Sequence, residues 1–155
     1  MELQVGPFDP ALHVRSRDHY EAVRREIQLL ELQPGEPPAR LEELAARLAA
    51  QFPPSDVDEV VERAYQAGES KFIARAVVPD ELLTAAIEAC DEVEALLDEL
   101  DRWAQNKQAN LLEAPDDVKR YRAAYLAQVR EQLEAATRPA DPRTAPSNRR
   151  KPGSP

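Results

Sequence analysis

The sequence predicts an all-α fold, a helical bundle of about five helices with a long central helix and a disordered C-terminal tail. Three observations predict it. Ala, Leu, Glu and Arg dominate the composition, and all four are good helix formers. Only 4 glycines and 5% aromatic residues are present, too few for the tight turns and β-formers of a sandwich or barrel. Apolar residues also recur every three or four positions along most of the chain.

The 155 residues fit one domain with two flanking segments. Residues 1–15 are expected to form an irregular N-terminal lead-in, because glycine and two prolines interrupt them. Residues 16–137 are expected to form the helical bundle domain. Residues 138–155 are expected to form a disordered, basic, proline-rich tail, since they contain five prolines and no large apolar residue.

Within the bundle, five helices are expected, at about 17–33, 37–52, 56–67, 80–106 and 116–137. Prolines or glycine separate most of them, as is typical of helix boundaries. Residues 71–78 are the one stretch with strand character. Because a lone strand has no pairing partner, we expect an extended connector that packs on the helices.

The long helix carries a heptad-like apolar seam. Its residues step by three and four positions and are expected to be buried: Leu83, Ile87, Cys90, Val93, Leu97 and Leu100. Such a seam packs either inside the bundle or against a second copy of the chain, so a homodimer is an alternative.

The net charge of −9 is unevenly distributed. The tail carries five basic residues and one acidic residue, so the folded body is the strongly acidic part. An acidic body repels phosphate backbones, which argues against nucleic-acid binding by the folded part.

The chain shows no sign of secretion or membrane insertion. Its first ten residues resemble neither a signal peptide nor an anchor. No stretch approaches the roughly 20 apolar residues that span a bilayer. Cys90 is the only cysteine, so no intramolecular disulfide forms, which suits a reducing compartment. We therefore expect a cytoplasmic protein with no membrane contact.

The sequence predicts no catalytic residue, no cofactor and no metal. The four glycines are far apart, so no phosphate-binding loop can be assembled. No Glu-x-x-His motif of a di-iron bundle is present. Cys90 lies between Ile87 and Val93 in the apolar seam, where packing is the favoured interpretation over a nucleophile. The chain is therefore expected not to be an enzyme.

The two histidines have different expected settings. His13 lies in the lead-in and is expected to be a solvated loop residue. His19 opens the first expected helix and has two interpretations. It is either a phospho-accepting histidine of a phosphorelay protein or a structural histidine paired with a carboxylate. We favour the structural interpretation, because Tyr20 and Glu21 crowd the imidazole.

The same helix carries the candidate interaction residues His19, Glu21, Arg25 and Glu26. Glu21 and Arg25 are four residues apart, in the favourable acid-first order for an ion pair. His19 and Glu26 are seven apart and share a face. His19 and Glu26 flank the apolar stripe, so they can reach a neighbouring helix, and the four residues together are the candidate interaction face for a partner protein.

The long helix also carries an acidic stripe of Asp91, Glu94 and Asp98. Three interpretations remain open for it, one of them a binding site for cations or a basic partner. In the other two, the stripe either forms salt bridges inside or at the rim of the bundle, with Arg24, Arg25 or Arg120 as the cations, or is a solvated face.

Several short motifs resemble one protein family. The first is His19-x-Glu21-x-x-x-Arg25-Glu26 with the apolar residues that follow. The second is Pro38-Ala39-Arg40-Leu41. The third is Val78-Pro79 followed by Leu96-Leu97-Asp98-Glu99-x-Asp101. The last is Leu111-Leu112-x-x-Pro115 with Tyr125-Leu126. Over about residues 16–135 the chain resembles an uncharacterised family of small helical actinobacterial proteins.

Members of that family are encoded near anti-sigma kinases, anti-sigma antagonists and their phosphatases. The resemblance implies a regulatory adaptor in a partner-switching pathway. It does not imply kinase activity, since the chain lacks the Asp-x-Gly-x-Gly motif of such kinases. We therefore expect a non-enzymatic protein-interaction module whose partner is another protein. The alternatives are a phosphorelay protein that uses His19 and a structural bundle that associates with itself.

Overall fold

The computed structural model describes residues 1–31, 43, 46, 56–106 and 113–138. In chain order its elements are β1 (Glu2–Phe8), α1 (Pro10–Glu31), α3 (Asp56–Gln66), β2 (Phe72–Val77), the short 3-10 helix η1 (Asp80–Leu82), α4 (Leu83–Gln105) and α5 (Asp116–Thr137). The described part is mostly helical, as predicted. It is not all-α, because its four α-helices are joined by a two-stranded sheet.

Two predicted segments lie outside the described residues. They are the helix expected at 37–52, apart from Glu43 and Ala46, and the tail expected at 138–155, apart from Arg138. Among the described helices, none is both long and apolar enough to cross a membrane.

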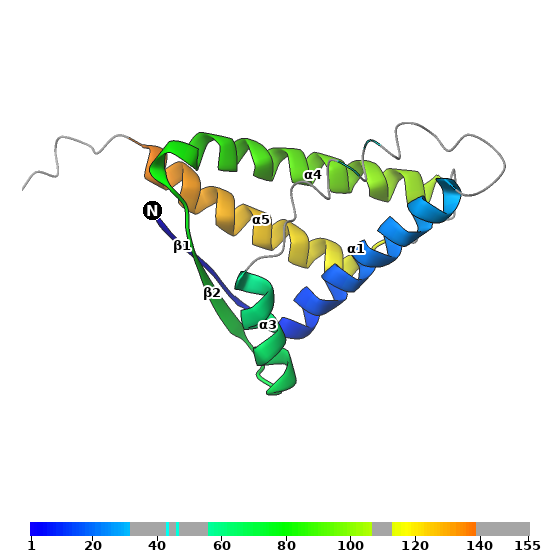
Figure 1. Cartoon of the computed structure of the whole chain (residues 1–155), viewed down its shortest axis with the longest axis horizontal. Helices are drawn as coiled ribbons and strands as arrows, with labels where there is room; N and C mark the ends of the chain where they lie inside the picture. Colours follow the sequence, from blue (N-terminus) through cyan, green and yellow to red (C-terminus); the bar gives the residue numbers. More distant parts are fainter. Residues whose placement is uncertain (32–42, 44–45, 47–55, 107–112, 139–155) are drawn as a thin grey trace, which may run out of the picture.

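The described elements form a triangular frame (Figure 1). Helices α4 and α5 run antiparallel, side by side, along one side of it. Helix α1 forms the second side and the two strands form the third. Helix α3 lies at the corner where α1 meets the sheet, and it contacts both.

The N-terminal lead-in, expected to be irregular, instead forms the strand β1, which pairs antiparallel with β2. Leu3 pairs with Ala76 and Val5 with Ala74, and Leu3, Val5 and Ala74 are buried. The alternation of polar and apolar residues explains the strand, since side chains on a strand point alternately to opposite faces. The strand-like segment expected at 71–78 therefore has a partner, and its prediction as an unpaired connector was wrong.

Gly6 shapes the strand rather than ending it. Its φ of 116° lies in a region that favours glycine, and a Cβ atom there would overlap the carbonyl oxygen of Phe72. The pairing is irregular between Val5 and Phe8, as in a β-bulge. The breakers in the lead-in thus allow the strand to bend as it approaches α1.

The edge of β1 that faces away from β2 is closed by two glutamine side chains of α5. The Gly6 N–H donates to Gln128 Oε1 at 2.7 Å, and Gln128 Nε2 donates to the Gly6 carbonyl at 2.9 Å. The Gln4 N–H donates to Gln132 Oε1 at 2.9 Å, and Gln132 Nε2 donates to the Gln4 carbonyl at 2.7 Å. Two side-chain amides thus take the place of a third strand.

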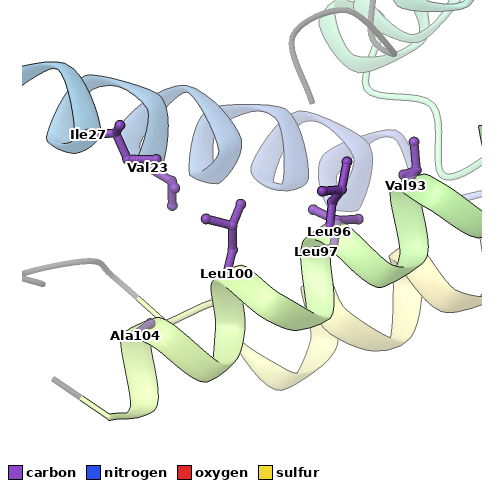
Figure 2. Packing of buried hydrophobic residues seen from close by; sticks show 7 residues of the cluster. All are labelled: Val23, Ile27, Val93, Leu96, Leu97, Leu100 and Ala104. Carbon is purple, nitrogen blue, oxygen red and sulfur yellow. The ribbon is translucent and has the colours of Figure 1, made fainter. Parts of the chain in front are cut away.

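The apolar seam of α4 is buried, as predicted. Its buried residues are Leu83, Cys90, Val93, Leu96, Leu97, Leu100 and Ala104, while Ile87 is half-buried. Figure 2 shows part of this core, with Val23 of α1 reaching toward Leu100 of α4. Residues of α1 and α5 cover the seam from within the same chain. In the described part of the chain the seam is therefore an internal core.

The acidic stripe on α4 forms salt bridges at the rim, but with a cation of α5 that was not predicted. Arg130 contacts Asp91 at 2.8 Å and Glu94 at 2.6 Å. Asp98 is exposed. The predicted Arg24 and Arg25 lie on α1, whereas α5 runs alongside this part of α4. The predicted Arg120 lies on α5 but near its N-terminus, where it is exposed.

Candidate functional site

Helix α1 begins seven residues earlier than predicted, and this shift creates the candidate site. The Asp9 carboxylate accepts a hydrogen bond from the Ala11 N–H at 2.8 Å, as a helix N-cap does. Pro10 follows at the first helical position, where its missing N–H costs nothing. His13 therefore lies in the first turns of a helix and not in a solvated loop.

A cavity of about 390 Å³ lies between α1, α3, α4 and α5. Its volume is within the range of ligand pockets in proteins, about 300–1,000 Å³. Helix α1 lines it with residues three and four positions apart: His13, Ser16, Arg17, Tyr20 and Glu21. Apolar walls come from the other helices: Val57, Val93, Leu97 and Leu126.

His13 joins three of the surrounding elements at the wall of the cavity. Its Nδ1 lies 2.6 Å from the Tyr121 hydroxyl of α5, and its Nε2 lies 3.4 Å from Asp58 Oδ1 of α3. The imidazole ring also lies edge-on to Phe72 of β2, with ring centroids 5.7 Å apart. Its side chain is only 16% exposed. The prediction of a solvated histidine was therefore wrong.

The protonation states in this cluster follow from burial. Burial, together with electrostatic interaction with Tyr125 and Asp58, raises the pKa of Tyr121 far above its ordinary value, so the hydroxyl keeps its proton. Burial also lowers the pKa of His13, although Asp58 opposes this shift. We therefore assign a neutral imidazole, in which Tyr121 donates to Nδ1 and the Nε2 hydrogen points toward Asp58.

A second tyrosine completes the aromatic wall. Tyr125 lies beside both His13 and Tyr121, at centroid distances of 6.2 and 6.0 Å. Burial raises the pKa of Tyr125 to about 12. The wall therefore presents neutral aromatic groups at ordinary pH.

Two arginines carry positive charge at the cavity. Arg17 lies 3.4 Å from Glu62 of α3, and Arg122 lies 2.8 Å from Asp101 of α4. The Arg122 pair is well buried, with 14% and 15% of the two side chains exposed. Each guanidinium offers five N–H donors, and a single carboxylate cannot accept hydrogen bonds from all of them. Both arginines can therefore hold a carboxylate and still donate to a ligand.

The predicted interaction residues do not form one site. Glu21 lines the cavity, but its ion pair is with Arg24 at 3.4 Å and not with Arg25. Arg25 is exposed and Glu26 is half-buried. These residues therefore point in different directions from α1.

His19 lies beside the cavity rather than in it. It lines a small pocket of about 10 Å³ with Leu100, Asp101 and Arg122. Burial, with the charge of Arg122, lowers the pKa of His19. The half-buried ring thus packs against the α4–α5 pair, as a structural histidine does.

The remaining candidate chemistry is limited. Among the described residues, no group of three or more His, Cys, Asp or Glu side chains is arranged to hold a metal ion. Cys90 is buried, and burial raises the pKa of its thiol, which lowers its nucleophilicity at neutral pH. The cavity is thus best suited to holding a ligand through its apolar walls, its tyrosines and its two arginines.

Comparison of the chain with protein-family models, with curated proteins and with solved structures finds no match.

Proposed function

We propose that this chain is a non-enzymatic protein-interaction module. A partner protein docks where α1 meets α3 and α5 and inserts a large apolar side chain into the cavity. The observation that carries the proposal is the composition of the cavity. Tyrosines and arginines surround an apolar floor, and these residue types are enriched where protein interfaces bind most strongly.

The bonding of the polar groups favours binding over catalysis. Both ring nitrogens of His13 are engaged, by Tyr121 and by Asp58. A general base needs a ring nitrogen that can reach a substrate proton. Polar groups that already satisfy one another also cost little to cover with an apolar side chain, since none loses its hydrogen bond.

The residues that line the cavity also indicate which side chains the partner inserts. An aromatic or branched aliphatic side chain would fill the apolar floor formed by Val93, Leu97 and Leu126. A carboxylate or carbonyl group beside it would accept from Arg17 or Arg122. The family resemblance in the sequence supports a partner from an anti-sigma kinase and phosphatase pathway.

The test begins by finding the partner with a photo-cross-linking side chain at Ser16, on the cavity wall. The same side chain at Arg120, which is exposed on α5, is the control. A protein cross-linked from Ser16 and not from Arg120 is then purified, and its affinity is measured. Ser16→Phe fills the cavity and should weaken binding about ten-fold or more.

Gln28→Phe adds the same ring at an exposed position of α1 and should leave the affinity unchanged. Melting temperatures of both variants verify that they fold. Equal affinities for Ser16→Phe and the unsubstituted chain would exclude the cavity as the docking site.

A phosphorelay role for His19 is the rival proposal, and it predicts a different result. Incubation with a phospho-donor would label the chain, and His19→Ala would abolish the label. The half-buried ring beside Arg122 gives less support to this role than the cavity gives to docking.

A further inference from the structure

The two edges of the β1–β2 sheet are treated differently. The outer edge of β1 is closed by the Gln128 and Gln132 side chains. On β2, the hydrogen bond from the Val78 N–H to the Met1 carbonyl, at 2.9 Å, fixes which residues face β1. Bonding alternates along an antiparallel pair, so Ala76 and Ala74 also face β1.

By the same alternation, the backbone groups of Ile73, Arg75 and Val77 point away from β1. Within the described part of the chain, no hydrogen bond to these backbone groups is found. Ile73 and Val77 are 49% and 80% exposed, and the Arg75 side chain is 69% exposed. Proteins usually prevent other chains from pairing with such an edge by covering it, twisting it or placing charged side chains on it. On β2, Arg75 is the one charged residue.

We propose that this edge of β2 accepts an extended segment of another protein as a third, antiparallel strand. The segment has an apolar, any, acidic, any, apolar pattern. Its acidic residue lies opposite Arg75, and its apolar residues lie opposite Ile73 and Val77. The interaction uses a surface separate from the cavity, so it stands or falls independently of the proposed docking there.

Backbone bonds and side-chain pairs both support this occupant. Strand addition gives affinity through main-chain hydrogen bonds, and alternate side chains give specificity. Directly opposed side chains of complementary charge or matched apolar character stabilise a pair of strands. The pair of Arg75 with Glu2, at 3.6 Å, is exposed on both sides and leaves other guanidinium N–H groups for a partner carboxylate.

A second copy of this chain fits the edge less well. Pairing two β2 strands about Arg75 places the two arginines directly opposite each other, which is unfavourable. A two-residue shift of the register in either direction places Arg75 opposite the apolar Ile73 or Val77. The net charge of −9 on each copy adds a repulsion.

The test uses the full chain and a capped seven-residue peptide. The peptide has valine at its second and sixth positions, glutamate at its fourth and threonine elsewhere. Amide hydrogen exchange followed by NMR should show that the N–H groups of Ile73, Arg75 and Val77 become protected as the peptide is added. Ala74 and Ala76, already bonded to β1, should be protected throughout.

Two matched series make the result specific. Replacing the glutamate by lysine should weaken binding about five-fold or more, and Arg75→Glu should reverse that preference. N-methylation of the fourth peptide residue, whose N–H faces β2, should abolish binding to the unsubstituted chain. N-methylation of the third or fifth residue, whose N–H faces outward, should not.

Three results would overturn the proposal: no gain of protection at these three amides, equal binding of the glutamate and lysine peptides, or equal effects of all N-methyl positions. Protection that rises with the concentration of the chain alone would assign the edge to a second copy instead. The N-methyl series needs no variant of the chain, so the test holds even if Arg75→Glu does not fold.

Discussion

Helix α1 contributes to two regions that are held together in different ways. Toward its C-terminus, Val23 and Ile27 pack into an apolar core with Leu97 and Leu100. Near its N-terminus, His13 is held by hydrogen bonds and ring contacts from other elements. The core depends on filled volume, whereas the His13 cluster depends on individual polar atoms. Substitutions that remove volume or single atoms therefore separate the two regions.

The largest effect is expected in the core. Leu97→Ala should lower the free energy of unfolding by about 2–5 kcal/mol, the cost of emptying a buried leucine site. Urea denaturation measures it. Asp98→Ala, at the exposed neighbouring position, should change stability by less than about 0.5 kcal/mol. A loss for Leu97→Ala that is no larger than for the control would mean that this side chain is not packed inside the chain.

In the His13 cluster, removal of one oxygen atom should have a measurable effect. Tyr121→Phe deletes the hydroxyl that lies 2.6 Å from His13 Nδ1 and leaves that nitrogen without its partner. We expect a loss of about 1–3 kcal/mol in the free energy of unfolding. Tyr65→Phe, at an exposed tyrosine, is the control and should be nearly silent. If both changes were silent, the Tyr121–His13 bond would contribute nothing to folding.

The His13 cluster should also respond to pH. The pKa of His13 is lower in the folded chain than its ordinary value of 6.5, chiefly because of burial. The unfolded chain therefore binds a proton first, and stability falls as pH drops below about 6.5. The loss continues until the pH passes the folded pKa.

This loss is measured as the difference in unfolding free energy between about pH 7.5 and pH 5.5. His13→Gln should make the difference smaller. His19→Gln should act in the same direction, because the pKa of His19 is also lowered. An unchanged pH dependence in both variants would show that neither imidazole resists protonation in the folded chain.

The smallest loss of stability is expected from two residues of α1 that contribute little to either region. The double change His19→Ala plus Arg25→Ala should lower the free energy of unfolding by less than about 1 kcal/mol and leave the circular dichroism spectrum intact. Arg25 is exposed and His19 is half-buried, so little packing is lost. If the double change also lowers the affinity for the partner by more free energy than it lowers stability, the docking surface includes these two positions of α1.

The core could be predicted from the sequence because its pattern is local. The seam of α4 repeats within one helix, and the spacing alone indicated which side chains are buried. The helix expected at 80–106 matches α4 closely once the short η1 at its start is counted. Salt bridges of the acidic stripe were also expected. That Arg130 is the cation depends on how α5 lies against α4, which the sequence does not show.

The His13 cluster could not be predicted because its contacts are distant in sequence. Tyr121 follows His13 by 108 positions and Asp58 by 45. No local period links such residues. One local signal was available: Asp9-Pro10 is a helix start, with a capping carboxylate before a proline. Treating Pro10 only as a breaker placed His13 in a loop.

The same distance affected β1. Its alternation of polar and apolar residues was present in the sequence, but its partner strand begins near residue 72. The side chains that close its other edge lie on α5. Neither a pairing nor an edge contact of this range leaves a mark in a single sequence, so the sequence alone predicts an irregular segment here.

The placement of β1 also has a consequence for the synthesis of the protein. Residues 2–8 are made before all the elements that contact them, and Gln128 and Gln132 follow their backbone partners by 122 and 128 positions. At about 5–20 residues per second, a ribosome needs roughly 6–26 seconds to reach them. Until residues 72–77 have been made, Leu3 and Val5 also lack their partner strand β2. The nascent chain therefore presents an apolar strand well before translation supplies the groups that close it.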